Sequence, residues 1–236
     1  MAGLGNVIAG WQPPPRPQEA GMTGRLVGLE PLSAEDHAAE LFAAYAGHDA
    51  LWDFMPYGPF PSARAYHDWA EERQSGDDPR FYVLRDLASG RAGGVASYLR
   101  ITPEAGSIEV GHICIAPGLQ RAAAVTEAMY LMMRWAFAAG YRRYEWKCNA
   151  LNLGSRRAAQ RLGFSYEGVF RNHMVIKGRN RDSAWFSVID SEWPALEKAF
   201  AVWLSPDNFD RAGRQITRLS DLTAPLRVAS DPLIGQ

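Results

Sequence analysis

The sequence predicts an α+β fold in which one mixed sheet is covered by helices. Three observations support this prediction. The predicted elements follow the order β-α-α-β-β-β-α-β-α-β-β, and three consecutive strand-like runs between residues 80 and 116 are separated only by short turns. Apolar residues make up 47% of the 236 residues, which is enough to bury a core. We expect a domain over residues 24–204, with a proline-rich arm over 1–23 and a tail over 205–236.

The first third of the chain is predicted to hold an arm, a strand and two helices. QPPPRPQ (12–18) cannot form a helix or a central strand, because proline lacks the amide donor and fixes φ, so we expect a solvated lead-in. GRLVGLEPL (24–32) is strand-like. One helix is expected over 33–47, from a capping serine to a glycine, and a second over 61–76.

The middle of the chain predicts a meander followed by a long helix. The runs 80–87, 91–102 and 107–116 are strand-like and are separated by turn-forming residues, so antiparallel neighbours are expected. The segment 119–140 has apolar residues at spacings of three and four and ends at a glycine, which indicates an amphipathic helix. The run 141–150 alternates between polar and apolar residues, as a strand does.

The last third predicts a short helix, a hairpin and a final helix. The helix over 152–162 ends on a glycine, and Phe164 begins the next strand. The hairpin is expected to turn around GRNRD (178–182), and a helix is expected over 191–204. The tail after residue 205 is interpreted as docked or loose.

Composition and charge exclude several classes of function. The net charge of −1 provides no global basic field, so we expect neither nucleic acid nor an anionic membrane as a partner. No apolar run approaches the roughly 18 residues that a membrane span needs. Cys114 and Cys148 form no metal-ligand pattern with the five scattered histidines, so no metal is expected. Two free thiols favour a reducing, cytoplasmic compartment.

Two strand-to-helix junctions are candidate ligand sites. The strand 107–116 leads into a helix whose start is rich in small side chains, Ala122 to Ala124, beside Arg121. Unpaired amides at a helix N-terminus bind anions, although an alanine-rich start also suits helix propensity alone. Asn152 follows the next strand and would face a crevice at the strand ends, or it is simply an N-cap.

Several motifs together resemble one enzyme superfamily. QRAAAVTEA follows a strand, and N-x-x-S-x-x-x-A-x-x-x-G-F-x-x-E-G runs from Asn152 to Gly168. IEVGH precedes them, and EGVFRNHMVIKGRNRDSAWFSVI closes the pattern. In order and spacing, over about residues 24–195, they resemble the GCN5-related N-acetyltransferase (GNAT) superfamily, and most closely its ribosomal-protein-alanine acetyltransferase-like branch. The resemblance implies a three-layer α/β/α fold, whose mostly antiparallel sheet splays between strands 4 and 5 to admit acetyl-CoA.

The resemblance also implies where acetyl-CoA binds. The backbone of 113–115 would pair with the pantetheine arm, and the amides of 120–126 would hold the pyrophosphate. Val125 departs from the small residue that the family's loop carries, and Arg156 and Arg161 would lie near the phosphates or on the solvent face. The implied binding residues are Ile113, Cys114, Ile115, Gln120, Arg121, Ala122, Ala123, Ala124, Val125, Thr126, Asn152, Ser155 and Arg157.

By the same resemblance, an amine attacks the thioester directly within a ternary complex. Glu109 stands where many relatives place a base, and its alternative role is a structural hydrogen bond. His112 is the second candidate base, provided that a bulge turns it to the same face. Ser155 is the candidate acid toward the sulfur, because the position at which many relatives carry a tyrosine is Ala159. Ala159 and Val125 keep a second interpretation open, a catalytically weak acyl-CoA sensor or scaffold.

The acceptor is expected to be a primary amine, either a protein N-terminus or a small molecule. By the same resemblance, the aromatic loop over 48–60 and the hairpin around 178–182 would line the acceptor pocket. From the residues alone, the loop is a binding rim, or a loop held to the core by its own side chains. Aromatic residues and an aspartate of this loop are the candidate acceptor-binding residues: Trp52, Asp53, Phe54 and Tyr57. A homodimer is possible on sequence grounds if Phe200 and Trp203 are exposed, while the alternative is that both dock on the sheet.

Overall fold

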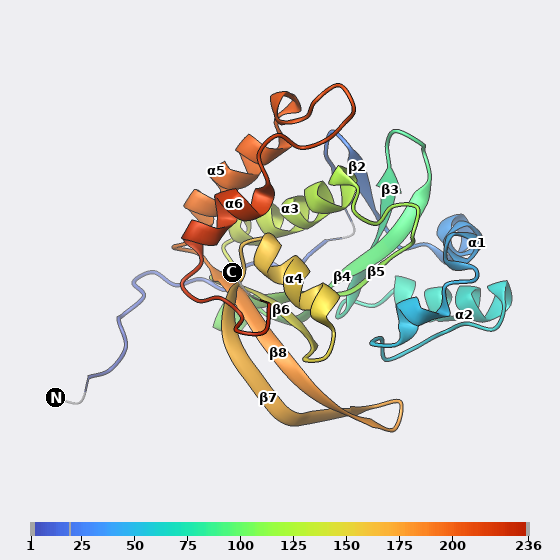
Figure 1. Ribbon diagram of the computed structural model, residues 1–236. Helices are drawn as coiled ribbons and strands as arrows, with labels where there is room; N and C mark the ends of the chain where they lie inside the picture. The colour runs from blue at the N-terminus through green and yellow to red at the C-terminus, as the bar shows by residue number, and fades with distance from the viewer. Residues whose placement is uncertain (1–2, 19, 235–236) are drawn as a thin grey trace.

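The computed structural model describes residues 3–18 and 20–234, and these form one eight-stranded sheet with helices on both faces (Figure 1). The strand order is β1-β2-β3-β4-β5-β6-β8-β7, and β5 and β6 are the parallel pair within the described chain. The strands are β1 (Met22–Thr23), β2 (Val27–Pro31), β3 (Arg80–Asp86), β4 (Ala92–Thr102), β5 (Ser107–Ile115), β6 (Arg143–Asn149), β7 (Ser165–Ile176) and β8 (Arg179–Ile189). The predicted mixed, mostly antiparallel sheet is confirmed.

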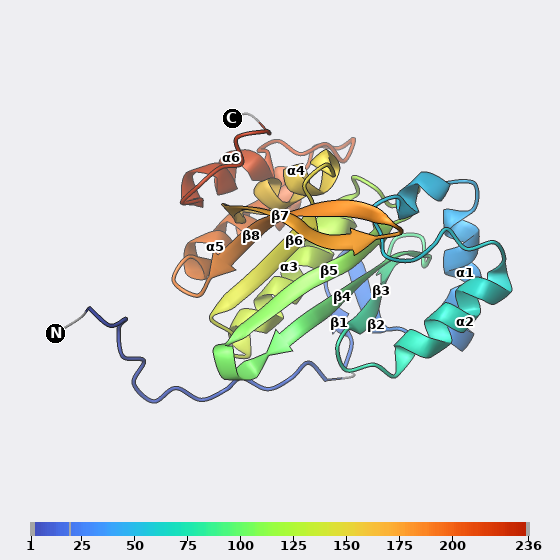
Figure 2. The same ribbon diagram turned by 90° about the horizontal axis from the view of Figure 1, so that it is seen from below.

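Helices divide between the two faces of the sheet. The α-helices are α1 (Ala34–Tyr45), α2 (Ala63–Gln74), α3 (Ala123–Ala138), α4 (Leu153–Arg161), α5 (Trp193–Leu204) and α6 (Leu219–Thr223). Short 3₁₀ turns are η1 (Asp49–Trp52), η2 (Pro103–Ala105), η3 (Pro206–Asn208) and η4 (Ala224–Leu226). One apolar core joins α3 and α5 to the sheet, and a second joins α1 and α2 to β3, β4 and β5. Viewed from below, α1 and α2 cover only one end of the sheet, so the other end of that face stays open (Figure 2).

Alternation along the strands gives this open face its chemistry. In β6, Tyr144, Trp146 and Cys148 belong to the first core, while Glu145 and Lys147 point to the opposite face. The same alternation holds in β5 and β8, whose core-facing residues are also apolar. Charged side chains from neighbouring strands are therefore aligned across the open face.

The hairpin of β7 and β8 differs from the prediction. Lys177 and Gly178 form the turn, with φ of 48° and 71°, so residues 179–182 belong to β8 rather than to a loop. A two-residue turn with positive φ at both positions matches the twist of the paired strands, which is why the hairpin is tighter than the sequence suggested. The side chain of Lys177 donates to the carbonyl of Trp52 (2.8 Å), so the hairpin tip reaches the loop after α1.

Part of the N-terminal arm and the tail pack on the domain. The predicted lead-in over residues 12–18 is mostly exposed, but it docks at two points, because Pro14 and Pro17 are buried and the Tyr141 hydroxyl donates to the carbonyl of Pro15 (3.1 Å). Proline still excludes regular structure there, but it packs well as an extended segment. Phe200 and Trp203 are 0% and 3% exposed, so the dimer-face interpretation of α5 is wrong and the docking alternative holds.

A buried ion pair fastens the tail to α4. Arg156 (1% exposed) donates from Nε and Nη2 to the two carboxylate oxygens of Asp231, at 2.5 Å each, and from Nη1 to the carbonyl of Ala150 (2.7 Å). The side chain of Gln160 accepts from the amide of Asp231 (2.7 Å). The sequence predicted that Arg156 lies near a phosphate site or on a solvent face, and it lies at neither. It is buried instead, because it forms an ion pair with Asp231, 75 residues along the chain.

We expect Asp231→Asn to lower the free energy of unfolding by about 3–5 kcal/mol, because it leaves the Arg156 guanidinium buried without a counter-charge. Urea denaturation followed by tryptophan fluorescence would measure the change. Asp210→Asn is the matched control, since Asp210 pairs with an exposed Arg214, and we expect little change there. A loss for Asp231→Asn no larger than that of the control would contradict the structural role of the pair.

Candidate active site

The strands β5 and β6 part at the middle of the sheet. Their parallel pairing runs from Ser107 opposite Arg143 to Val110 opposite Trp146, and both strands continue beyond that point without pairing to each other. A parted pair leaves backbone donors and acceptors that a ligand can satisfy. The sequence-predicted splay between the fourth and fifth strands of the domain is confirmed.

A bulge in β5 lies at the same point. Cys114 pairs with Val95 and Gly111 with Ser97, so β5 has one more residue than β4 in this interval. His112 takes a φ of 51°, which a non-glycine residue adopts only when its surroundings hold it there. The bulge was the condition under which His112 was predicted to turn toward Glu109, and both side chains line the same cleft.

Two clefts meet where the strands part. The helix cleft lies between the end of β5 and the starts of α3 and α4, and the hairpin cleft lies on the open face, between β5, β6, the η1 loop and the β7–β8 hairpin. Four residues line both clefts: Ile113, Trp146, Asn152 and Ser155. A molecule in one cleft can therefore touch a molecule in the other at these residues.

The helix cleft contains most of the predicted cofactor-binding residues. Those that line it are Ile113, Cys114, Ile115, Gln120, Arg121, Val125, Thr126, Asn152 and Ser155. Ala122, Ala123 and Ala124 belong to the start of α3 without lining the cleft, and Arg157 is exposed outside it. Arg161 lines the cleft and donates to Oγ1 of Thr126 (3.0 Å).

The N-terminus of α3 suits an anion. Its N-cap, Ala122, offers no side chain to the amides of the first turn, whereas α1, α2 and α4 are capped by Ser33, Ser62 and Asn152. Unpaired amides and the helix dipole attract negative charge. Gln120, by contrast, is committed to the strand, because its side-chain amide donates to the carbonyl of Ile115 (3.0 Å).

A serine lies at the junction of the clefts. Asn152 Oδ1 accepts from the amide of Ser155 (3.0 Å), so this asparagine is an N-cap as well as a cleft residue. The indole Nε1 of Trp146 donates to Oγ of Ser155 (3.0 Å). Because the indole group can only donate, the hydroxyl hydrogen of Ser155 remains available to a second acceptor.

Glu109 lies in a charged network on the open face. It is 3% exposed and accepts from Arg100 Nη1 with both oxygens (2.9 and 2.8 Å) and from Lys147 Nζ (3.0 Å). Burial raises the pKa of Glu109, while Lys147 and Arg100 act in the opposite direction. Lys147 also contacts Glu145 (2.7 Å) and lies 3.7 Å from the ring centre of Trp185.

His112 is held neutral by its surroundings. Tyr57 shares a hydrogen bond with Nδ1 (3.1 Å) and stacks on the imidazole at 5.5 Å, and Phe81 packs at 5.2 Å. Burial is the largest cause that lowers the pKa of His112, the positive charges of Arg100, Arg73 and Arg181 act in the same direction, and together they bring it to about 4. No hydrogen bond from the described residues engages Nε2, and His112 lines the hairpin cleft.

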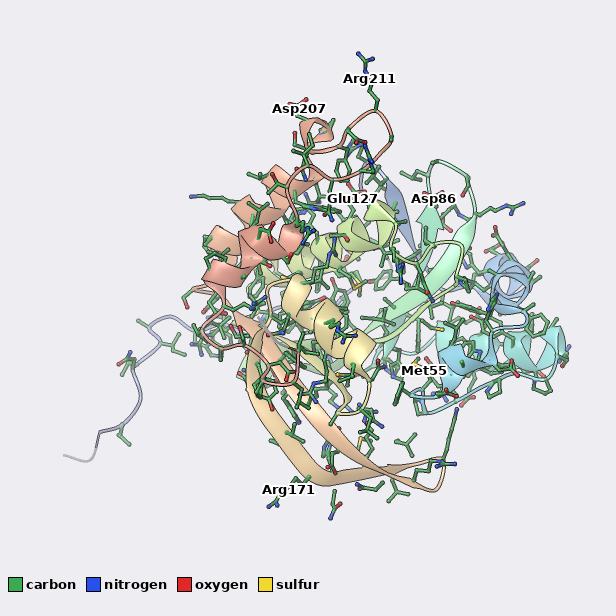
Figure 3. The ribbon with its side chains drawn as sticks, viewed as in Figure 1. Met55, Asp86, Glu127, Arg171, Asp207 and Arg211 are labelled. Atoms are coloured by element: carbon green, nitrogen blue, oxygen red, sulfur yellow. The ribbon has the colours of Figure 1, made fainter. Side chains whose placement is uncertain are left out.

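The aromatic loop contributes differently from the prediction. Phe54 lines the hairpin cleft, but Trp52 is 3% exposed and belongs to the second core, and Asp53 lines neither cleft. Tyr57 acts by contacting His112 rather than by forming a wall. Met55 completes the wall between the η1 loop and the hairpin (Figure 3).

Sequence reasoning did not name several residues that line the hairpin cleft. Arg100, Lys147, Met174 and Arg181 are among them, and they come from four strands. A signal existed for Lys147, since strand alternation places it on the face opposite to Trp146. Arg181 lies in the segment 178–182, which the resemblance implied as part of the acceptor pocket, but no local pattern singles out this residue.

Comparisons with known proteins agree with this geometry. The model of the family described as "Acetyltransferase (GNAT) domain" matches residues 26–165. A GCN5-related N-acetyltransferase from Brucella melitensis has 45% sequence identity and a TM-score of 0.90, with 92% of this chain and 100% of that chain covered. A probable acetyltransferase of the GNAT family from Chromobacterium violaceum has 40% identity and a TM-score of 0.78, over 83% and 98% of the two chains.

More distant similarity concerns the fold alone. A putative ribosomal-protein-serine acetyltransferase from Vibrio cholerae has 16% identity and a TM-score of 0.63, over 72% of this chain and 98% of that chain. No curated protein matches the sequence. None of the helices formed by residues 3–18 and 20–234 has the length and apolarity that a bilayer crossing requires. The family match and the parted strands lead to one conclusion: the chain belongs to the GCN5-related N-acetyltransferase family and is an acetyltransferase.

Proposed function

We propose that this enzyme transfers the acetyl group of acetyl-CoA to a primary amine, by direct attack of the amine on the thioester in a ternary complex. The observation that carries the proposal is the junction of the two clefts, where Ser155 and Ile113 border both. A thioester in the helix cleft and an amine in the hairpin cleft would meet there. Holding two reactants in contact removes much of the entropic barrier to their reaction.

The helix cleft has the features that acetyl-CoA needs. The unpaired part of β5, Ile113 to Ile115, offers its backbone to the pantetheine amides, as an added strand would. The uncapped start of α3 offers its amides to the pyrophosphate. Arg161 lies beside this helix start, because it donates a hydrogen bond to Oγ1 of Thr126. Val125 is compatible with this role because it already has helical geometry in the first turn of α3. When bound, acetyl-CoA supplies the activated acetyl group.

His112 is the group that takes the proton from the amine. The imidazole is neutral above about pH 4, lines the hairpin cleft and has Nε2 available. Burial raises the pKa of Glu109, but this side chain is 3% exposed and both of its oxygens already accept hydrogen bonds from cations, so the amine reaches it less readily than it reaches His112. Glu109 instead fixes Arg100 and Lys147 on the open face.

Ser155 donates to the sulfur as the thiol leaves. Its hydroxyl accepts from Trp146 and lies beside the thiol of Cys148, and a hydroxyl that accepts a hydrogen bond becomes a better donor toward the sulfur of a bound thioester. Ala159, at the slot where a tyrosine was considered, is 0% exposed and packed in the first core. The serine therefore supports catalysis over the purely binding role of a sensor.

We expect Ser155→Ala to lower kcat by about 100-fold, the smaller end of the range for loss of one acid–base group, with little change in the Kd for acetyl-CoA. Thiol release across a panel of amines would measure kcat, and isothermal titration would measure binding. Ser191→Ala, an exposed serine after β8, is the matched control and should have no effect. Full activity of Ser155→Ala would contradict the acid role.

The binding step tests the proposed function itself. We expect acetyl-CoA to bind the folded protein, with heat detectable at millimolar cofactor or below. Absence of binding by protein whose fold is verified by circular dichroism would refute the acetyl-transfer proposal. Binding without thiol release from any amine of the panel would instead identify a sensor of acyl-CoA.

The pH profile tests the base. Because the pKa of His112 is lowered to about 4, the imidazole stays neutral as pH rises from 4, and no inflection in kcat/KM is expected near its ordinary value of 6.5. The inflection should instead move with the pKa of the acceptor amine. His112→Ala should lower kcat by about 100-fold, and exposed His48→Ala should not. A fall of that size in Glu109→Gln, with His112→Ala unaffected, would reassign the base.

A further inference from the structure

The open face of the sheet carries more positive than negative charge around the hairpin cleft. A row of charged residues crosses β4 to β8, with four cations and three carboxylates: Arg100, Arg143, Lys147 and Arg181, and Glu109, Glu145 and Glu167. Three of the four cations contact carboxylates of this row. Arg181 is the remaining one.

The paired members of the row satisfy one another. Arg143 contacts Glu145 (2.7 Å) and Glu167 (2.5 Å). Lys147 forms ion pairs with both Glu145 (2.7 Å) and Glu109 (3.0 Å). Arg100 forms a second ion pair with Glu109, at 2.8 Å. Among the described residues, none of these carboxylates forms an ion pair with Arg181.

Arg181 is positioned but not neutralised. Its Nε donates to Oγ of Ser183 (3.2 Å), and the same hydroxyl contacts Nδ1 of His173 (2.9 Å). Among the described residues, its terminal nitrogens make no hydrogen bond and no carboxylate forms an ion pair with it. Burial is the largest effect and lowers the pKa of Arg181; the charge of Arg100 acts in the same direction, while Cys148 and Glu109 act in the opposite one. A guanidinium that lines a cleft with two unused donor groups is suited to bind an oxyanion in bidentate fashion.

The rest of the cleft agrees with an anionic acceptor. Among the described residues that line the cleft, Glu109 is the one acidic side chain, and its oxygens are already engaged by Arg100 and Lys147. A polyamine or another acceptor with a second positive charge would therefore meet cations and no free carboxylate. Asp53, the predicted partner for a cationic amine, does not line the cleft.

We propose that the acceptor is a small primary amine that also carries an oxyanion, a carboxylate or a phosphate, and that Arg181, flanked by Arg100, binds that oxyanion. This inference rests on the proposed acetyl transfer. The apolar wall that Phe54, Met55 and Met174 provide would contact the body of the acceptor between the two groups. An apolar α-amino acid has all three features.

Matched acceptor pairs test the charge requirement. We would compare phenylalanine with phenethylamine and leucine with isoamylamine, which differ by the carboxylate, and phosphoethanolamine with ethanolamine, which differ by the phosphate. Thiol release gives kcat and KM for each. We expect a KM at least about 10-fold lower for the anionic member of a pair, and the pair that shows the difference identifies carboxylate or phosphate as the oxyanion.

Arg181→Gln tests the residue. The substitution keeps a hydrogen-bonding side chain and removes the charge, so KM for the anionic acceptor should rise about 10- to 100-fold, while KM for the neutral partner and Kd for acetyl-CoA stay unchanged. Arg179→Gln is the control, an exposed arginine on the same strand outside the cleft. Arg181→Lys should bind the anionic acceptor more tightly than Arg181→Gln does, because lysine keeps the positive charge but lacks the paired donors of the guanidinium.

Two kinetic results would overturn the proposal. The first is a neutral amine that is used as well as its anionic partner in every pair. The second is an Arg181→Gln variant whose kcat falls while KM for the acceptor is unchanged, because that would assign Arg181 to the leaving thiol.

A binding measurement separates this inference from the proposed function. If no amine releases thiol, calorimetry with N-acetylphenylalanine, N-acetylphenethylamine and N-acetylphosphoethanolamine in the presence of CoA still measures recognition of the oxyanion. Tighter binding of an anionic ligand, lost in Arg181→Gln, would support the inference without turnover. Equal or absent binding of all three ligands would refute it.

Discussion

The parting of β5 and β6 after Val110 and Trp146 is the constraint on which the site depends. Parallel strands release their chains at the same edge of a sheet, so the helices that follow, α3 and α4, start on either side of the gap. One start is uncapped and the other is capped by Asn152, which also lines the gap. The gap therefore brings together free backbone groups, a helix dipole and a polar side chain from segments about thirty residues apart. If β5 and β6 paired along their whole length, these three features would not face a common space.

The C-terminal tail stabilises one side of that gap. Arg156 joins Asp231 of the tail to the carbonyl of Ala150, which belongs to the loop between β6 and α4. This loop leads directly into Asn152 and Ser155, so the tail contacts the segment that positions both. The amide of Tyr166 also donates to the carbonyl of Ala229 (3.1 Å), which attaches the tail to β7. The start of α4 is thus held from its outer side while its inner side faces the cleft.

Sequence patterns predicted the parts of the structure that depend on local chemistry. Capping at Ser33 and Asn152, strand alternation in β6 and the chain order from β2 to α5 were predicted, because each depends on neighbours within a few residues, whereas β1 and α6 were not. Family resemblance then located the gap and Ser155. The remaining features depend on contacts between distant segments.

Arg156 illustrates this limit. Three arginines near a helix start predicted a phosphate or solvent contact for Arg156, but its partner lies in the tail, and no pattern around residue 156 points to Asp231. Trp52 appeared to be a rim residue by composition, yet four aromatic rings within 6.4 Å hold it in the second core. His112 faces the cleft only because β5 has one residue more than β4 between paired positions, and register is a property of the two strands together.

A single set of cations connects the proposed chemistry with the proposed acceptor. Arg100 and Lys147 both form ion pairs with Glu109, the carboxylate that the family resemblance implied as the first candidate base. The charges of Arg100 and Arg181 also disfavour protonation of His112, which leaves a neutral imidazole facing the cleft. The same positive field would repel an acceptor that carries only further positive charge and attract one whose oxyanion balances its amine. The proposed proton acceptance by His112 and the proposed selection of an anionic acceptor would therefore be two consequences of one charge distribution, and a change to Arg181 would alter selection while Arg100 continues to keep the imidazole neutral.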